Sequence, residues 1–145
     1  MVDAQFVPSV YHYDHETREW TMTQVLAIAA GGAVGALLRY WTSIAVHSRL
    51  GTAFPYGTLA VNIIGSLLMG FLYIWLIERM AAGPAVRAFL LIGVLGAFTT
   101  FSTFSMETLN LMEAGHAGKA LVNMLVSVIV CITAAGLGVL AARQL

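Results

Sequence analysis

The stretch Gly93-Val-Leu-Gly-Ala-Phe-Thr-Thr-Phe-Ser-Thr-Phe-Ser105 decides how this chain folds. It lies inside an apolar run long enough to cross a bilayer, and it places glycine, hydroxyl side chains and phenylalanines near the middle of that run. Lipid offers no hydrogen bonds, so an interrupted helix at that depth is stable only where protein or a water-filled cavity satisfies its backbone. The stretch therefore predicts a helix break near Gly96–Thr100, and a polar ligand bound or carried there.

The composition of the whole chain also indicates a membrane protein. Of its 145 residues, 59% are hydrophobic and 10% are charged, against roughly 25% charged residues in ordinary soluble domains. Four apolar runs each reach the roughly 20 residues that a spanning helix needs. These runs are Val25–Val46, Gly57–Ile77, Ala88–Met112 and Ala120–Ala142. We therefore expect an all-α integral membrane protein, with one domain of four transmembrane helices over residues 24–145.

Residues 1–23 differ in character from the rest. They are rich in charged residues and contain His12 and His15, but they lack the pattern of a signal peptide. We expect a polar, flexible tail whose histidines bind no metal, because no scaffold fixes them. The formal net charge of the chain is zero, which gives no reason to expect a nucleic-acid partner.

The positive charges give only a weak signal for orientation. With the spans as drawn, four arginines fall on the side of the N-terminus, while Arg49 and Lys119 fall on the other. The four are Arg18, Arg79, Arg87 and Arg143. So small a bias leaves two alternatives open: a cytoplasmic N-terminus, or insertion in both orientations, which would permit an antiparallel dimer.

Polar residues occur in the first two spans. Arg39 carries a charge within an apolar helix, and it either extends to the headgroups or faces a wet vestibule that attracts anions. Gly31 and Gly35 indicate close helix packing, within one subunit or between two. Asn62 shares one helical face with Thr58 and either bonds a neighbouring helix or offers its amide N–H groups to an anion.

After the expected break, Phe101, Phe104, Ser105 and Thr108 recur at helical spacing and share one face. Aromatic rings have a positive edge, so two rings and nearby hydroxyls would stabilise a small anion weakly enough to release it. Glu107 is interpreted as a hydrogen-bonded or arginine-paired group near a water-filled mouth, with a proton relay as the alternative.

The fourth span carries a stripe of small and polar residues. Asn123, Ser127 and Cys131 follow one another at steps of four. The stripe either packs helices together or forms a polar track beside a conduction path.

These residues resemble the Fluc (CrcB) family of fluoride channels. The resemblance extends over about Gln24 to Leu145 and depends on three strings, one in each of the first three spans. They are Gly32-x-x-Gly-Ala-x-x-Arg39-Tyr-Trp, Gly57-Thr-Leu-Ala-Val-Asn62 and Thr99-Thr-Phe-Ser-Thr-Phe-Ser-Met-Glu107.

The resemblance implies a passive, fluoride-selective channel of the cell (inner or plasma) membrane that exports fluoride. It also implies an antiparallel homodimer with two pores. The implied fluoride path is Asn62, Phe101, Phe104, Ser105, Thr108 and Ser127, with Arg39 at the vestibule. Backbone carbonyls of Gly96 and Thr99 would hold a structural sodium ion between the subunits, and no organic cofactor is implied.

Two other classes of protein remain as alternatives. Small proton-coupled drug exporters also have four helices, but they rely on a carboxylate in the first span, and Met22–His47 contains none. A non-conducting membrane scaffold would use the small residues for packing alone. The sequence shows no nucleotide-binding loop and no nucleophile–base pair, so we do not expect an enzyme.

Overall fold

The structure is a computed structural model that describes residues 21–145, all of whose regular elements are helical. The elements are α1 (Met22–Leu50), α2 (Tyr56–Ile74), the π-helix η1 (Trp75–Arg79), α3 (Pro84–Arg87), the π-helix η2 (Ala88–Leu95), α4 (Gly96–Phe98), α5 (Phe101–Glu113) and α6 (Ala117–Gln144).

These elements form four helical segments that are long and apolar enough to cross a membrane. The segments are Met22–Leu50, Tyr56–Arg79, Pro84–Glu113 and Ala117–Gln144. The prediction of four spans is therefore confirmed, and each segment is somewhat longer than its apolar run. The expected tail, residues 1–23, lies almost wholly outside the described residues, and α1 includes its last two positions.

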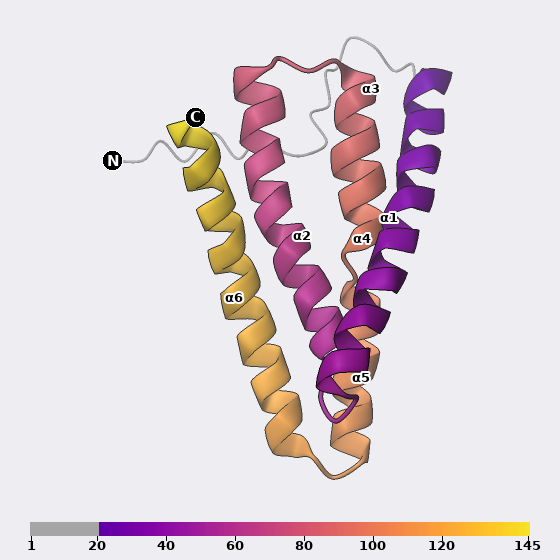
Figure 1. Ribbon diagram of the computed structural model, residues 1–145, viewed down its shortest axis with the longest axis vertical. Helices are drawn as coiled ribbons and strands as arrows, with labels where there is room; N and C mark the ends of the chain where they lie inside the picture. Colours follow the sequence, from indigo (N-terminus) through magenta and orange to yellow (C-terminus); the bar gives the residue numbers. More distant parts are fainter. Residues whose placement is uncertain (1–20) are drawn as a thin grey trace.

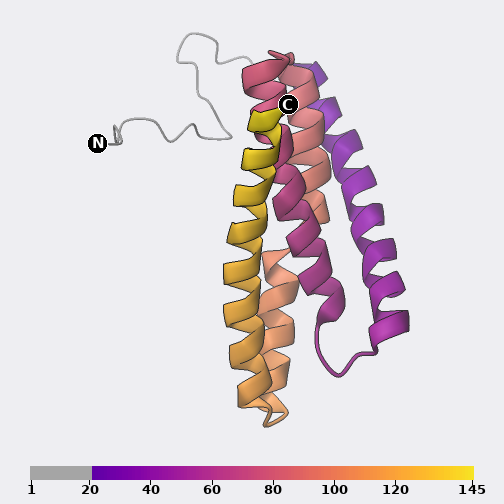
Figure 2. The same cartoon turned by 60° about the vertical axis from the view of Figure 1, so that its left-hand side comes forward.

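The segments stand roughly parallel, with α1 and α6 on opposite sides of α2 (Figures 1 and 2). The end that is uppermost in Figure 1 carries the start of α1, the loop from η1 to α3 and the C-terminus of α6. The other end carries the loop from α1 to α2 and the short turn from α5 to α6. Arg79, Arg87 and Arg143 therefore lie at one end, and Arg49 and Lys119 lie at the other.

Glycines bring α2 and α6 into direct backbone contact. A Cβ atom on Gly70 would overlap the carbonyl oxygen of Ala135, and one on Gly138 would overlap that of Leu67. Without side chains at these points the two helix axes approach closely, which strengthens van der Waals packing between the helices. This packing matters in lipid, because a bilayer provides no hydrophobic drive between helices. The two helices form the most extensive pair in the fold.

The same device joins α1 to η2. A Cβ atom on Gly31 would overlap the carbonyl oxygen of Phe89, and one on Gly35 would overlap that of Val94. The predicted small-residue pair in the first span therefore packs within the subunit. Both glycines are buried, although most of α1 is not.

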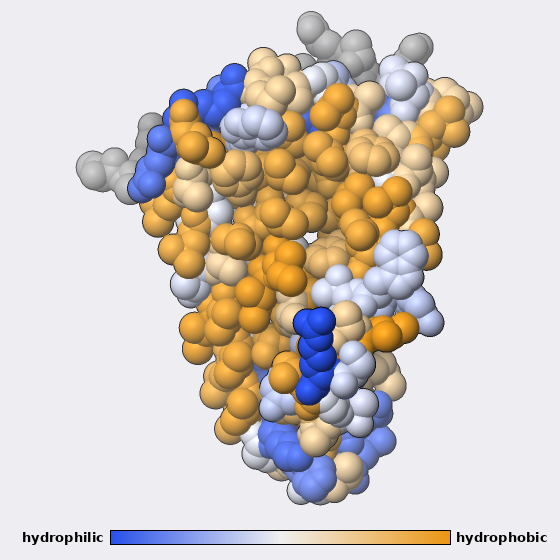
Figure 3. All heavy atoms as spheres, viewed as in Figure 1, coloured by the Kyte–Doolittle hydropathy of each residue, from blue (hydrophilic) through white to orange (hydrophobic). Residues whose placement is uncertain are grey.

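The buried apolar core is small and lies in the half of the bundle that contains η1 and η2. Its centre is Leu76, Leu91 and Leu95, each 3% exposed. Elsewhere large apolar side chains cover the outside, and hydrophilic residues gather mainly at the two ends of the long axis, with a further strongly hydrophilic patch on the lower half of the visible face (Figure 3). This pattern fits a body surrounded by lipid, with its ends in water.

Candidate functional site

The third span is broken in its middle, at Thr99 and Thr100. Thr99 has φ −76° and ψ 157°, and Thr100 has φ −152° and ψ 115°, so both are extended. Helix α4 ends at Phe98 and α5 begins at Phe101. The predicted break is confirmed, and it is confined to the last two residues of the predicted range.

Asn62 of α2 holds this break by two hydrogen bonds. Its Nδ2 donates to the carbonyl oxygen of Thr100 at 3.1 Å, and the backbone N–H of Thr100 donates to its Oδ1 at 2.8 Å. A side-chain amide thus satisfies the peptide groups that the break leaves without helical partners, as the bilayer requires. The alternative in which Asn62 bonds a neighbouring segment is realised, and one of its two N–H groups remains for another acceptor.

Gly65, three residues further along α2, makes room for the break. A Cβ atom there would overlap the side-chain methyl of Thr99 and lie 3.2 Å from Cδ1 of Phe98. Asn62 and Gly65 therefore present one face of α2 to the broken segment, through a hydrogen-bonding side chain and a missing one.

The break leaves the backbone carbonyls of residues 96 to 99 without their helical donors, and those of Gly96 and Thr99 are among them. In a continuous helix, Thr100 N–H would donate to Gly96 and Thr103 N–H would donate to Thr99. Here Thr100 N–H donates to Asn62, and Thr103 N–H donates to the side-chain oxygen of Thr100 at 3.2 Å. The carbonyls of Gly96 and Thr99 are the pair for which the family resemblance implies a structural sodium ion, and their oxygen chemistry suits a hard cation.

Thr100 caps the N-terminus of α5. Its hydroxyl oxygen accepts from Thr103 N–H and donates to Thr103 Oγ1 at 2.9 Å. This places the N-terminal end of a 13-residue helix in the middle of the span. Unpaired N–H groups and the helix dipole make that end favourable for negative charge.

Phe101 and Phe104 lie together on the first turn of α5. Their ring centroids are 5.3 Å apart and their planes are tilted by 42°. Phe101 is 78% exposed within the single chain, whereas Phe104 is half-buried. The structure thus brings the predicted aromatic pair together beside the helix N-terminus.

The predicted hydroxyl donors differ in whether their protons are free. Ser105 Oγ donates to the carbonyl of Phe101 at 2.9 Å, and Thr108 Oγ1 donates to that of Phe104 at 2.7 Å. Such bonds to the preceding turn are common for hydroxyls in helices. Ser127 Oγ, by contrast, is buried on α6 and has no partner among the described residues.

A buried asparagine joins α6 to α5. Asn123 is 1% exposed, and its Nδ2 donates to Thr108 Oγ1 at 2.8 Å. The sequence indicated a polar stripe on the fourth span, but it did not identify Thr108 as the partner. Steps of four on each helix mark a face, while the pairing of two faces depends on how the helices turn against each other.

Arg39 and Glu107 lie apart from the break. Arg39 lies within α1, eleven residues before the end of the helix. It is half-buried and makes no hydrogen bond or ion pair to any residue in 21–145. Glu107 borders a hollow of about 340 Å³ that His47 and Asn110 also line. Its Oε2 is buried without a hydrogen-bond partner in the described chain, so the expected hydrogen bond or arginine pair is not made through that atom. Its position beside a hollow agrees with the expected place near the mouth of a water-filled cavity.

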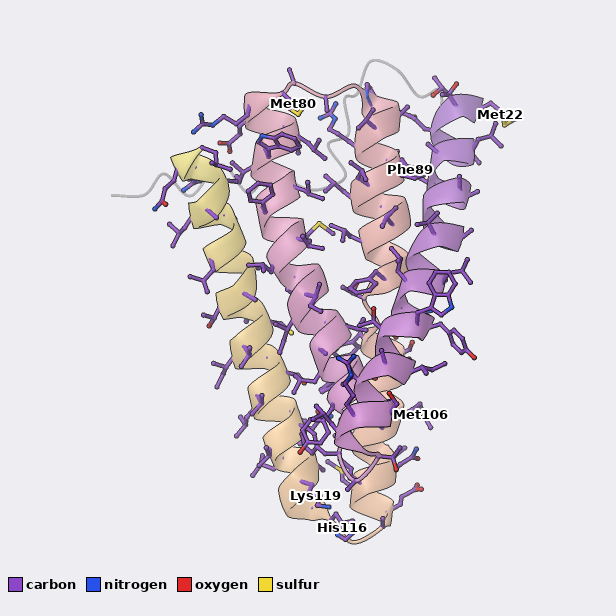
Figure 4. The ribbon with its side chains drawn as sticks, viewed as in Figure 1. Met22, Met80, Phe89, Met106, His116 and Lys119 are labelled. Atoms are coloured by element: carbon purple, nitrogen blue, oxygen red, sulfur yellow. The ribbon has the colours of Figure 1, made fainter. Side chains whose placement is uncertain are left out.

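A hydrogen bond also joins α6 to the loop before α2 at the lower end of the bundle, beside a second hollow that Ala53 and Lys119 line. Lys119, which Figure 4 shows beside His116 at this end, donates from Nζ to the carbonyl oxygen of Ala53 at 3.2 Å. The bond joins the start of α6 to the loop between α1 and α2. This exposed polar contact links the two loops' neighbouring elements at the end of the bundle away from the C-terminus.

Comparisons with a family model and with individual proteins point to the same family. Residues 26–139 match the family model described as CrcB-like protein, Camphor Resistance (CrcB). A protein of Magnetococcus marinus, named fluoride-specific ion channel FluC, is 52% identical over 120 residues, which are 83% of this chain and 98% of that protein. Proteins of the same name from Coxiella burnetii (52% identity, 83% of this chain and 98% of that protein) and Methylococcus capsulatus (51%, 83% and 53%) are similarly close.

Proposed function

The chain belongs to the CrcB family, and on that premise we propose that it is a passive, fluoride-selective ion channel that lets fluoride leave the cell. It is a multi-pass protein of the cell membrane, with four membrane-length helices. The names of its relatives describe a channel rather than an enzyme.

The observation that carries this proposal is the break at Thr99–Thr100. It sets neutral donors, the N-terminus of α5 and the Phe101–Phe104 pair at one depth in the middle of an apolar span. Fluoride is small and strongly hydrated, so a dry path must replace its water. Neutral donors and ring edges do so without the full positive charge that would hold the ion too tightly.

Each predicted path residue has a role in this mechanism. The remaining N–H of Asn62 and the unpartnered hydroxyl of Ser127 are donors available to the ion. Ser105 donates after its hydroxyl turns away from the preceding carbonyl, whereas Thr108 borders the path with its proton held by the carbonyl of Phe104. Arg39, which has no partner among residues 21–145, draws fluoride into the vestibule.

The working unit in this proposal is an antiparallel homodimer with two pores. Two observations favour it. The ends of the described bundle carry similar positive charge, with three arginines at one end and Arg49 and Lys119 at the other, so neither orientation is strongly preferred. Phe101 is largely exposed on the single chain, and a second subunit would cover it.

A structural sodium ion at the dimer centre is part of the proposal. The carbonyls of Gly96 and Thr99 lack their helical donors, and the same pair from a second subunit would complete a set of four oxygen ligands. The ion would neutralise these dipoles and hold the two breaks together. Dimer dissociation that is equally fast in sodium and in N-methylglucamine buffer would contradict this site.

The direct test is an efflux assay with a fluoride electrode on purified protein in liposomes, with chloride loading as the control. We expect fast fluoride release and no comparable chloride release. Vesicles that retain fluoride would refute the channel and favour the scaffold alternative. Proton-driven uptake of an aromatic cation would instead favour the exporter.

A further inference from the structure

The half-helix α5 depends on other segments for its orientation. The break separates it from α4, so a continuous helix does not fix how α5 turns about its own axis. It packs chiefly against α6, and it touches α2 more sparingly. Two asparagines supply the polar contacts: Asn62 at the break and Asn123 further along.

Asn123 begins a short series of hydrogen bonds that leads to Phe104. Its Nδ2 donates to Thr108 Oγ1 at 2.8 Å, and Thr108 Oγ1 donates to the carbonyl oxygen of Phe104 at 2.7 Å. Asn123 is 1% exposed and Thr108 is 5% exposed, so neither has water as an alternative partner in this chain.

The series has a direction, which chemistry imposes. An amide nitrogen only donates, so Thr108 Oγ1 accepts from Asn123 and must send its single proton elsewhere. The carbonyl of Phe104 receives that proton. Phe104 and Thr108 are four residues apart on one face of α5, and the bond to α6 therefore fixes the face that carries the aromatic ring.

We propose that Asn123 is a positioning residue for fluoride conduction. Through Thr108 it sets the rotation of α5, and with it the placement of the Phe101–Phe104 pair against the ion path. The inference rests on the proposed function. It assigns to Asn123 a role exerted through Thr108, without contact with the ion.

The experiment measures fluoride efflux from liposomes for Asn123→Leu and Thr108→Val. Each removes the interhelical bond while keeping a side chain of similar size. The free energies of interhelical hydrogen bonds in membranes convert to a factor of about threefold to about twentyfold. If the conducting placement of α5 loses the whole of that free energy, fluoride efflux falls by this factor, which is the result we expect. Thr108→Ser, which keeps the hydroxyl, should retain most of the wild-type rate.

Thr133→Val is the matched control. Thr133 lies on α6 like Asn123, but it is exposed and its hydroxyl donates at 2.8 Å to Ile129 of its own helix. Its replacement removes a hydroxyl of the same kind without breaking a bond between helices. We expect wild-type efflux.

Epistasis separates positioning from general loss of structure. The double variant Asn123→Leu/Thr108→Val should release fluoride no more slowly than the more impaired of the two single variants. In a Phe104→Ile background, Asn123→Leu should cause no further loss of efflux. Further loss in either combination would overturn the inference.

Wild-type efflux by Asn123→Leu would also overturn the inference, as would a defect confined to Thr108→Val, which would make Thr108 a direct ligand.

If Asn123→Leu does not assemble, the comparison of Thr108→Val with Thr108→Ser is the test, and an equal loss of efflux in both overturns the inference. A wild type that carries no fluoride refutes the proposed function and this inference together. A conducting wild type with an unaffected Asn123→Leu refutes the inference alone.

Discussion

In the proposed channel, single residues at the break have two separable duties, holding the backbone and facing the ion. Asn62 does the first directly, through its paired bonds with Thr100. Phe104 is assigned to the second, because its ring lies beside the N-terminus of α5 and packs against Phe101. A substitution at Asn62 should therefore lower stability as well as efflux, whereas one at Phe104 should lower efflux alone.

Replacing Phe104 with isoleucine should sharply reduce fluoride efflux and leave the protein assembled. Isoleucine fills space but has no positive ring edge. Efflux from liposomes measures the rate, and size-exclusion chromatography reports assembly. Phe71→Ile is the control, because Phe71 contacts Trp75 in the other half of the bundle, with ring centroids 6.1 Å apart. Unchanged efflux in Phe104→Ile would remove the aromatic edge from the mechanism.

Replacing Asn62 with leucine should lower stability as well as efflux. The substitution leaves the N–H and carbonyl of Thr100 without partners inside the bundle, at a cost of about 1–3 kcal/mol for each buried group. Thermal unfolding in detergent would show a lower midpoint. Asn110→Leu, an exposed position on α5, should leave that midpoint unchanged. Equal midpoints for the two variants would mean that the clamp contributes nothing.

At the scale of the helices, the molecule is assembled from backbone contacts at glycines. The α2–α6 and α1–η2 pairs both approach until carbonyl oxygens occupy the space where a Cβ atom would be. This explains how four segments with so small an apolar core remain together, since lipid provides no hydrophobic drive between helices.

Substituting Gly70 with valine should therefore separate α2 from α6. The new side chain would meet the backbone of Ala135, which cannot move aside as a flexible side chain does. We expect a loss of folded protein, measured as a falling monodisperse fraction after detergent extraction. Gly136→Val on α6 is the control, because a Cβ atom there meets nothing within 4 Å. Similar yields for both variants would show that the contact is dispensable.

The sequence predicted these elements well and their contacts only in part. Apolar runs located the spans, because length and hydrophobicity suffice for a bilayer. The cluster of hydroxyls after Gly96 located the break, because lipid tolerates such a cluster in few ways. The Asn62–Thr100 and Asn123–Thr108 pairs required the structure, because each joins residues from different spans, and periodicity reports one helix at a time.

At the scale of the whole molecule, the single chain shows surfaces that only a partner or lipid would cover. Phe101 is the plainest case, since a ring of the proposed conduction path is 78% exposed on the single chain. Arg39 is another, since its charge has no partner among residues 21–145. Both are accounted for in the proposed antiparallel dimer, which makes its topology the most informative property to measure.

Labelling from one side of the membrane tests that topology. His116→Cys places a thiol in the turn between α5 and α6, and Cys131→Ala removes the native one. An impermeant maleimide applied to intact cells should label about half of the protein if insertion occurs in both orientations. Complete labelling, or labelling only after the cells are opened, would establish a single orientation.

The bonds between Asn62 and Thr100 have a consequence for biosynthesis. The ribosome makes α2 before the third span, so the amide is already in place when the peptide groups of Thr100 reach the bilayer. Thr100 can then enter the bilayer with its N–H and carbonyl hydrogen-bonded to Asn62, instead of passing through a state in which both groups lack partners in lipid. A circularly permuted gene that delivers the third span first would remove this advantage, and its product should be retained by the insertion machinery or degraded.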